Sequence, residues 1–257
     1  MRKYLLHVLI ISFVFLLAPT VHVASCAGEL EDAKELVRNN PDDSDAHYTL
    51  GLAYFYTGKN EEAIESYKQA IRINPDLALA HFSLGNAYSN SGKHEEEIEA
   101  YKQVIRIDPD YKYAHNALGF VYGELGKHEE EIEAYKQVIR IDPDLALAHY
   151  NLGFAYYNSG RYEDAIKSYE QAIRIDPDYK YAHNALGLGY GKLGKYKEAI
   201  ESFKQTIRID PDDATAHYNL GNAYLGSNDR GSALEQYKIL KKLDTELANK
   251  LFNLINE

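Results

Sequence analysis

The sequence contains no tryptophan, a single cysteine and, apart from Pro19, no proline outside one regular series. One cysteine cannot form an intramolecular disulfide, so no disulfide framework holds this fold together. The 28 basic residues are outnumbered by 39 acidic ones, giving a net charge of −11 with no Lys/Arg cluster to offset it. An acidic surface repels phosphate backbones, so we expect no nucleic-acid partner. The sequence also shows no nucleophile–base pair, phosphate-cradling loop or metal cluster. We therefore expect no enzyme, no cofactor and no metal.

The one long apolar run lies near the N-terminus, from Leu5 to Leu17, and follows the basic residues Arg2 and Lys3. The run is short for a membrane span, which needs about 20 residues. A basic start followed by a short apolar run is the layout of a secretory signal peptide. We therefore expect a signal peptide over residues 1–25 and an exported protein.

The stretch Val23-Ala24-Ser25-Cys26 resembles the lipobox of bacterial lipoproteins, in which the chain is cut before the cysteine and the cysteine carries the lipid. The resemblance implies lipidation of Cys26 and a lipid-anchored location on the periplasmic side of a bacterial membrane. Pro19 and His22 depart from the apolar residues usual before that motif. Two alternatives are cleavage after Ala27, which gives a soluble secreted or periplasmic protein, and an anchor that is not cleaved.

Six prolines recur at intervals of 34 residues: Pro41, Pro75, Pro109, Pro143, Pro177 and Pro211. A fixed period of 20–50 residues indicates a solenoid, in which each repeat buries its apolar face against its neighbours. We number each repeat from slot one to slot 34, with proline in slot 32. The six repeats then cover residues 44–247, as 44–77, 78–111, 112–145, 146–179, 180–213 and 214–247.

Each repeat has the pattern of two helices. In the first helix, slots one to 14, an advance of about 100° per residue places slots four, seven, eight and 11 on one side, and they contain His, Leu, Gly and Tyr. In the second helix, slots 18 to 30, apolar residues three or four apart form one buried stripe. Slot 15 is Gly or, once, Asn228, which tolerate the left-handed turn that ends a helix. Gly in slot eight predicts the close approach of another helix backbone, and the second Asp of each Asp-Pro-Asp predicts a helix cap.

These slots resemble the tetratricopeptide repeat, with Leu-Gly-x-x-Tyr in the first helix, small and aromatic residues in the second, and a final Pro. The resemblance covers residues 44–247 and implies an all-α fold, a right-handed superhelical α-solenoid of helix hairpins whose first helices line a concave groove. In slot four, where the family often has Trp, this chain always has His. We expect a half-repeat helix and linker over residues 26–43 and a capping helix over residues 246–257, as solenoid ends require.

The same resemblance implies a non-enzymatic scaffold for protein–protein interaction that binds a peptide or protein segment in its groove. With the export signal, it predicts a role in assembling an envelope complex. Two alternatives are a glycan-binding or cell-wall-binding protein, whose tyrosines stack on sugar rings, and an accessory subunit of an envelope enzyme or of a pilus or secretion system. The sequence does not identify the partner.

Slots two, five, nine and 12 point about 120° away from the buried side of the first helix and, by resemblance, line the groove. The candidate groove residues are aromatic, aliphatic or amide side chains: Tyr48, Leu52, Phe55, Phe82, Asn86, Tyr113, Asn116, Phe120, Tyr150, Phe154, Tyr157, Tyr181, Asn184, Leu188, Tyr218 and Asn222. Such side chains suit contact with an extended peptide. In the alternative interpretation, some of the aromatics pack between neighbouring first helices.

Slot six and the internal duplication add detail to this surface. Asn151 and Asn219 occupy slot six, where part of the family carries an asparagine ladder, but the other repeats interrupt it with Thr49, Ser83, Ala117 and Ala185. Slots two, five and six contain no basic residue, so capture of a C-terminal carboxylate is not expected. Ile105–Gly119 and Ile173–Gly187 are identical, so we expect the groove to alternate with a period of 68 residues.

Two further features are repeated along the chain. The slot-four histidines lie in hairpins about 8–10 Å apart, too far to share a zinc ion, so we expect them to pack in the interior. Glu97 and Glu131 replace the Ala of slot 20, and each follows a histidine, His94 or His128, by three residues. We expect them to face the crowded interior of their hairpins, either as a soft spot copied by duplication or as a polar contact with a partner.

Overall fold

The structure is a computed structural model that describes residues 22–256, with side chains from residue 28 onward. These residues form helices and turns without any strand, which confirms the all-α fold. The chain divides into two compact units, Met1–Pro109 and Asp110–Glu257, which we call the N-terminal unit and the C-terminal unit. The signal-peptide prediction falls almost wholly outside the described residues, and the side chain of Cys26 lies outside them too.

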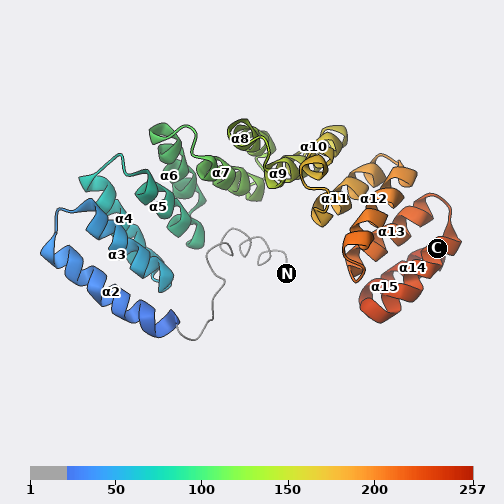
Figure 1. Cartoon of the computed structure of the whole chain (residues 1–257), viewed down its shortest axis with the longest axis horizontal. Helices are drawn as coiled ribbons and strands as arrows, with labels where there is room; N and C mark the ends of the chain where they lie inside the picture. The colour runs from blue at the N-terminus through green and yellow to red at the C-terminus, as the bar shows by residue number, and fades with distance from the viewer. Residues whose placement is uncertain (1–21, 257) are drawn as a thin grey trace. The chain divides into compact units, whose positions relative to one another are not determined.

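From residue 22 onward, the N-terminal unit consists of α2 followed by two helix hairpins (Figure 1). Its helices are α2 (His22–Asn39), α3 (Ser44–Tyr56), α4 (Asn60–Ile73), α5 (Ala78–Asn90) and α6 (His94–Ile107). Each helix from α2 to α5 packs against the next one along the chain. α2 buries Leu30 and Ala33 and packs on α3.

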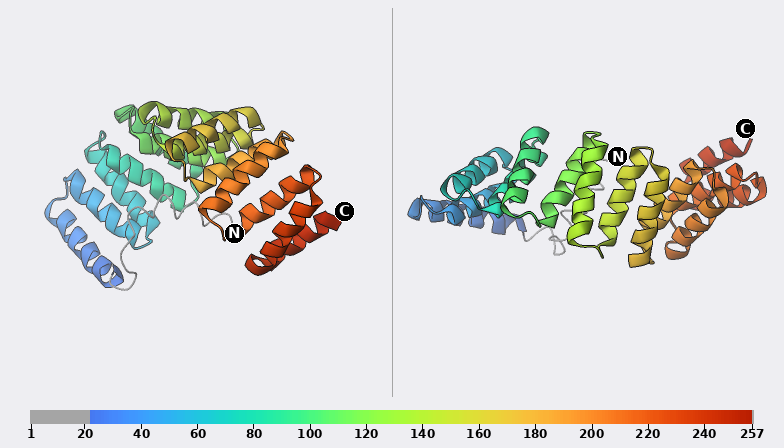
Figure 2. Two further views of the ribbon diagram at one scale, coloured as in Figure 1. Left: turned by 45° about the vertical axis from the view of Figure 1, so that its right-hand side comes forward. Right: turned by 90° about the horizontal axis from the view of Figure 1, so that it is seen from above.

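The C-terminal unit contains four hairpins and a final helix, and Figure 2 shows its later helices, in orange and red, from two directions. Its helices are α7 (Lys112–Glu124), α8 (His128–Ile141), α9 (Ala146–Asn158), α10 (Tyr162–Ile175), α11 (Lys180–Lys192), α12 (Tyr196–Ile209), α13 (Ala214–Gly226), α14 (Arg230–Leu243) and α15 (Thr245–Asn256). Each helix again packs against its successor, and α15 also packs on α13.

The first helix of every hairpin ends in a left-handed residue, as the sequence predicts. The slot-15 glycines have φ between 69° and 80°, and Asn228 has φ 61°. A side chain with a Cβ is disfavoured in this conformation, which explains why the slot contains glycine or asparagine. The turn that follows is short, so the second helix folds back directly onto the first.

The predicted role of the second Asp in each Asp-Pro-Asp is wrong. The N-cap residue follows that Asp, and in α5, α7, α9 and α11 it is Leu or Tyr without a capping side chain. Only Asp43 and Asp213, which occupy this later position, cap α3 and α13. The residue before the proline instead accepts a backbone hydrogen bond in a turn, as Asn74 does from the N–H of Asp76 at 3.2 Å.

The glycine of slot eight lies against a large side chain, an aromatic ring in the first five hairpins, and at Gly153 the predicted close helix backbone is present too, because an added Cβ would lie 3.2 Å from the carbonyl oxygen of Ala165. A Cβ added at Gly153 would lie 2.6 Å from the ring of Tyr169 in slot 24 of the same hairpin. In the last hairpin, Leu251 of α15 occupies the equivalent space next to Gly221. The missing side chain therefore makes room for the large residue that fills each hairpin.

The interior of each unit is built from the same slots. Ala fills slot three in every hairpin with no exposed surface, and Ile in slot 21 is 1–8% exposed in the first five hairpins. α15 contributes Ala248 and Leu251 to the interior, both fully buried. Leu254 is 37% exposed, so the buried face of α15 is narrow.

Candidate functional site: the first-helix stripe

The sixteen candidate groove residues form what we call the first-helix stripe, because all of them lie on the first helices of the hairpins. None of them is buried: four are exposed and the other twelve are half-buried. The four exposed side chains are apolar or aromatic: Tyr113 (60%), Tyr181 (50%), Phe154 (46%) and Leu188 (37%). Large apolar side chains at this exposure supply contact area for a partner.

Part of the stripe also contributes to the fold. The slot-five rings of Tyr48, Phe82 and Tyr150 pack on the slot-24 ring of their own hairpin, with centroids 5.5–5.9 Å apart. The ring of Tyr150 also lies 5.4 Å from that of Tyr179, and burial raises the pKa of its hydroxyl. The alternative interpretation is thus correct for slot five in one respect: these rings pack, although against second helices and turns.

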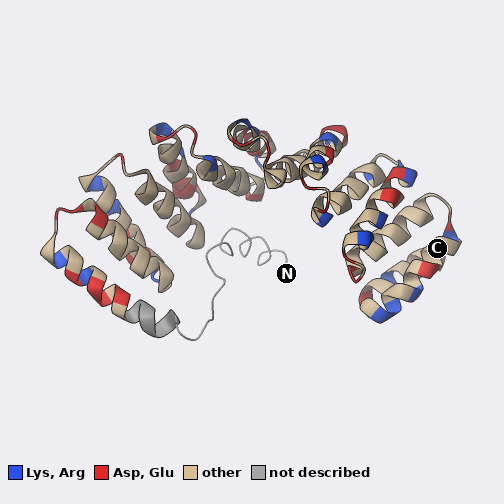
Figure 3. Cartoon of the chain, in the orientation of Figure 1, with Lys and Arg blue, Asp and Glu red and all other residues tan. Residues whose placement is uncertain are grey.

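The first helices carry little charge. α5, α9 and α13 contain no Lys, Arg, Asp or Glu, and in Figure 3 charges gather on the second helices and turns. The lysines that begin α7 and α11 are paired: Lys112 Nζ lies 2.7 Å from Asp142, and Lys180 Nζ lies 2.5 Å from Asp210. These hydrogen bonds raise the pKa of both lysines. The stripe therefore offers aromatic and amide contacts bordered by neutralised charges.

Asparagines of neighbouring first helices are joined in the C-terminal unit. Asn151 Nδ2 donates to Asn116 Oδ1 at 3.5 Å, and Asn219 Nδ2 donates to Asn184 Oδ1 at 3.0 Å. Slot six of one hairpin thus meets slot five of the hairpin before it. The ladder looks interrupted in the sequence when slot six of one repeat is compared only with slot six of the others. The alternation of Asn between slots five and six was the signal that this comparison missed.

The slot-four histidines link the first helix to the preceding turn by a hydrogen bond. In five hairpins, histidine Nε2 lies 2.9 Å from the carbonyl oxygen of the proline six residues earlier, so that nitrogen carries the proton and donates. His115, His183 and His217 are buried, and the other three are half-buried. Over the part of the chain that the structure describes, no cluster of three or more His, Cys, Asp or Glu side chains is arranged for a metal.

Glu97 and Glu131 face the interior of their hairpins, as predicted, and are 2% and 3% exposed. Each accepts a hydrogen bond from the histidine three residues earlier, at 3.0 Å from His94 and 3.2 Å from His128. Burial raises the pKa of Glu131, and the hydrogen bond from His128 opposes that rise. A Cβ added at Gly123, in slot 12, would lie 2.7 Å from the carboxylate of Glu131. The carboxylate therefore takes the space of a slot-12 side chain.

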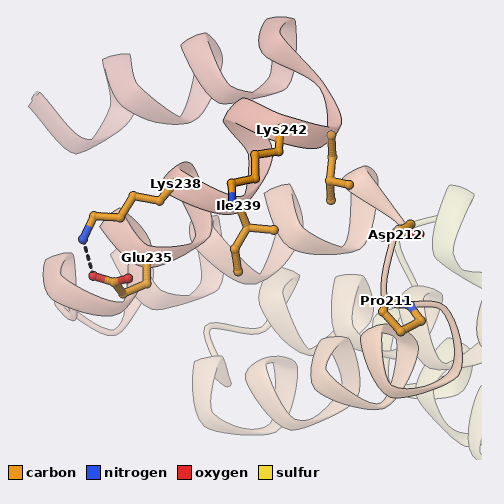
Figure 4. Close-up of a pocket in the computed structure, with 7 residues that line it drawn as sticks. Pro211, Asp212, Glu235, Lys238, Ile239 and Lys242 are labelled. Carbon is orange, nitrogen blue, oxygen red and sulfur yellow. Dashed lines mark hydrogen bonds and ion pairs between the residues drawn. The ribbon is translucent and has the colours of Figure 1, made fainter.

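One pocket of the C-terminal unit lies away from the first-helix stripe. It has a volume of about 330 Å³ and lies between the turn before α13 and the outer face of α14 (Figure 4). Pro211 and Asp212 line one side, while Ile239 and Leu243 line the other. Its Lys238 is paired with Glu235 at 2.6 Å. The pocket shares no residue with the stripe.

Within residues 22–256, no helix has both the length and the apolar character needed to cross a bilayer. A search of curated proteins found no significant match to the chain.

Solved structures share the architecture. The C-terminal part of a TPR repeat-containing protein from Cytophaga hutchinsonii matches with a TM-score of 0.78 at 16% identity, over 88% of this chain and 94% of that one. MamA matches with a TM-score of 0.61 at 27% identity, over 65% and 97%. YrrB, described as a TPR protein with an unusual peptide-binding site, matches with a TM-score of 0.63 at 19% identity, over 73% and 96%.

Family models identify the repeats themselves. The TPR repeat model matches residues 51–92, 90–126, 122–160 and 190–228, and the tetratricopeptide repeat model matches residues 146–179. These segments cover more than half of the 257 residues and extend over both units. The chain therefore belongs to the tetratricopeptide repeat family.

Proposed function

We propose that the chain is a non-enzymatic scaffold that binds an extended peptide or protein segment along the first-helix stripe, in the assembly of an envelope complex. The observation that carries this proposal is the exposure of Tyr113, Phe154 and Tyr181 on helices that are otherwise almost uncharged. Aromatic rings provide large contact area at low entropic cost, and amides pair with backbone groups. Tetratricopeptide repeats are generally interaction scaffolds, and the peptide-binding site named for YrrB supports the same use here.

Photo-crosslinking tests where the partner binds. A photoreactive amino acid at Phe154 reports on the stripe, and one at Lys167, whose side chain is 74% exposed on the second helix of the same hairpin, is the control. We expect protein adducts from envelope extract at position 154 and none at 167. Equal labelling at both positions would contradict the proposal, and an adduct removed by glycosidase would favour the glycan-binding alternative.

We also propose that residues 1–25 direct export and that Cys26 is lipidated, which places the protein on the periplasmic side of a bacterial membrane. The support is the basic start, the apolar run and the small residues before Cys26. Labelling cells with an alkyne fatty acid should mark the protein, and Cys26→Ala should abolish the label. A mature N-terminus at Gly28 would instead show ordinary cleavage after Ala27.

A further inference from the structure

Four side chains of the C-terminal unit recur as a group after 68 residues. We call Tyr113, Asn116, Tyr150 and Asn151 subsite A. Their counterparts form subsite B: Tyr181, Asn184, Tyr218 and Asn219. In each subsite, two side chains come from one first helix and two from the first helix of the next hairpin: α7 and α9 for subsite A, α11 and α13 for subsite B.

The two subsites have the same hydrogen-bond pattern, with N···O distances of 3.5 Å in subsite A and 3.0 Å in subsite B. Each is centred on one asparagine pair, with the donor in slot six and the acceptor in slot five of the preceding hairpin. The slot-two tyrosines, Tyr113 and Tyr181, are 60% and 50% exposed, and all the other members are half-buried. The subsites therefore share the asparagine pair and the exposed slot-two ring, but differ around slot five, where Tyr150 packs on Tyr169 and Tyr179 while Tyr218 packs against the cluster that contains Leu251.

The contacts that border each subsite are duplicated too. Arg140 pairs with Asp110 at 2.6 Å, and Arg208 pairs with Asp178 at 3.0 Å. The ring centroids of the tyrosine pairs are 5.7 Å apart for Tyr111 and Tyr113, and 6.0 Å apart for Tyr179 and Tyr181. The Nζ atoms of Lys112 and Lys180 lie 5.7 Å and 5.2 Å from the following tyrosine rings. The slot-two tyrosine ring therefore has the same kinds of neighbour, a tyrosine ring and a lysine ammonium group, in both subsites.

The chemistry of each subsite suits the backbone of an extended peptide. Each asparagine carries two N–H donors and one carbonyl acceptor, and one bond within the pair leaves both kinds of group for a ligand. A peptide unit presents one acceptor and one donor, so it can pair with the remaining N–H and carbonyl groups of the asparagines. The tyrosine rings beside the pair add apolar contact, and neither subsite contains a charged residue.

We propose that subsites A and B bind the same short, uncharged, extended peptide segment, so that one chain takes two copies and its natural partner contains that segment twice. This inference rests on the proposed function and specifies its ligand. Packed helices lie 8–10 Å apart, so the subsites are separated by roughly 20 Å. An extended chain covers about 3.3 Å per residue, so roughly six residues separate equivalent positions of the two copies.

The hairpins of the N-terminal unit lack this group. Their slots five and six contain Tyr48 with Thr49 and Phe82 with Ser83, so they have no asparagine pair. Two sites per chain are therefore expected, rather than one for every hairpin. The neighbouring slot-nine residues differ between the subsites, Phe154 near subsite A and Asn222 near subsite B, and these set a modest difference in affinity.

Stoichiometry tests the inference with the purified full chain. Short peptides are selected against it from a random library, and the selected peptide is titrated by calorimetry. We expect two peptides per chain. Asn116→Ala with Asn151→Ala should leave one site, Asn184→Ala with Asn219→Ala should leave the other, and all four changes together should remove both. Asn158→Ala, at an exposed position that ends α9, is the control and should leave two.

The variants should fold, because Ala already occupies slot six at Ala117 and Ala185 and the slot-five asparagines are only half-buried, and unchanged circular dichroism would confirm it. A tandem peptide in which the segment repeats after about six residues should bind one-to-one, at least tenfold more tightly than a single copy. If calorimetry gives one peptide per chain, and only one of the two double variants loses binding, the inference is overturned while the proposed function stands. Selected peptides whose binding survives all four changes and every substitution in the stripe would overturn the proposed function.

Discussion

The hairpins of the N-terminal unit and the C-terminal unit share their buried slots three and 20 and differ in slots five and six of the first helices. Ala in slot three and Ala or Glu in slot 20 are buried in both units. On the first-helix stripe, slots five and six read Tyr-Thr and Phe-Ser in the N-terminal unit, but alternate Asn-Ala with Tyr-Asn in the C-terminal unit. The fold constrains slots three and 20 most strongly, whereas slots five and six vary between the units even though the slot-five rings pack on slot 24.

The largest loss of stability is expected when a slot-24 ring is removed from each unit. Tyr67→Ala and Tyr169→Ala should each lower the free energy of unfolding by about 3–5 kcal/mol, because both rings are at most 1% exposed. Urea unfolding followed by circular dichroism measures the loss. Tyr56→Ala and Tyr113→Ala, at exposed rings, should change stability by less than about 0.5 kcal/mol. A loss of stability in only one of the two units would show that the buried slots are not equivalent.

A smaller effect is expected at Glu131. Burial raises its pKa above the ordinary value of 4.5. The native state then holds its proton more tightly than the unfolded state, so stability falls as pH rises from about 4.5 through the raised pKa. Glu131→Ala removes this penalty and recreates the Gly191–Ala199 combination of the hairpin 68 residues later. We expect a gain of about 1 kcal/mol at pH 7.

Thermal melts at pH 7 and pH 4.5 should show that the gain from Glu131→Ala shrinks at the lower pH. Glu97→Ala extends the test to the N-terminal unit, where the side chain is 2% exposed. Glu129→Ala, at a side chain that is 78% exposed, is the control. A clear loss of stability from Glu131→Ala at pH 7 would show that its contact with His128 outweighs the cost of burial.

The smallest effect separates two hydroxyl groups within the N-terminal unit. Tyr101 donates to Asn86 in slot nine at 2.8 Å, whereas the hairpin of Tyr67 has Leu52 in slot nine, and the buried Tyr67 hydroxyl has only a weaker contact with Ser83. Tyr101→Phe should cost about 1 kcal/mol, and Tyr67→Phe should be neutral or slightly stabilising. Urea midpoints measure both. Equal losses would show that slot nine has no influence on the interior.

The repeat pattern predicts the all-α hairpins because the same slots recur six times, and the left-handed glycines follow from local backbone sterics. Other features depend on contacts between helices, which a comparison of like slots does not show. The ring of Tyr169 beside Gly153, the bond between Asn151 and Asn116, and the histidine bond to the proline carbonyl all join different slots. The cap was misplaced by one residue because Asp follows each proline while the helix begins one residue later.

The central claim is that the exposed rings of the first-helix stripe serve binding and not stability. It is tested most directly by the triple variant Tyr113→Ala, Phe154→Ala and Tyr181→Ala, with peptide affinity and melting temperature measured on the same preparation. We expect affinity for the selected peptide to fall at least tenfold while the melting temperature stays within about 2 °C of the parent. Unchanged affinity would contradict the claim, and so would a melting temperature lowered as much as Tyr169→Ala lowers it.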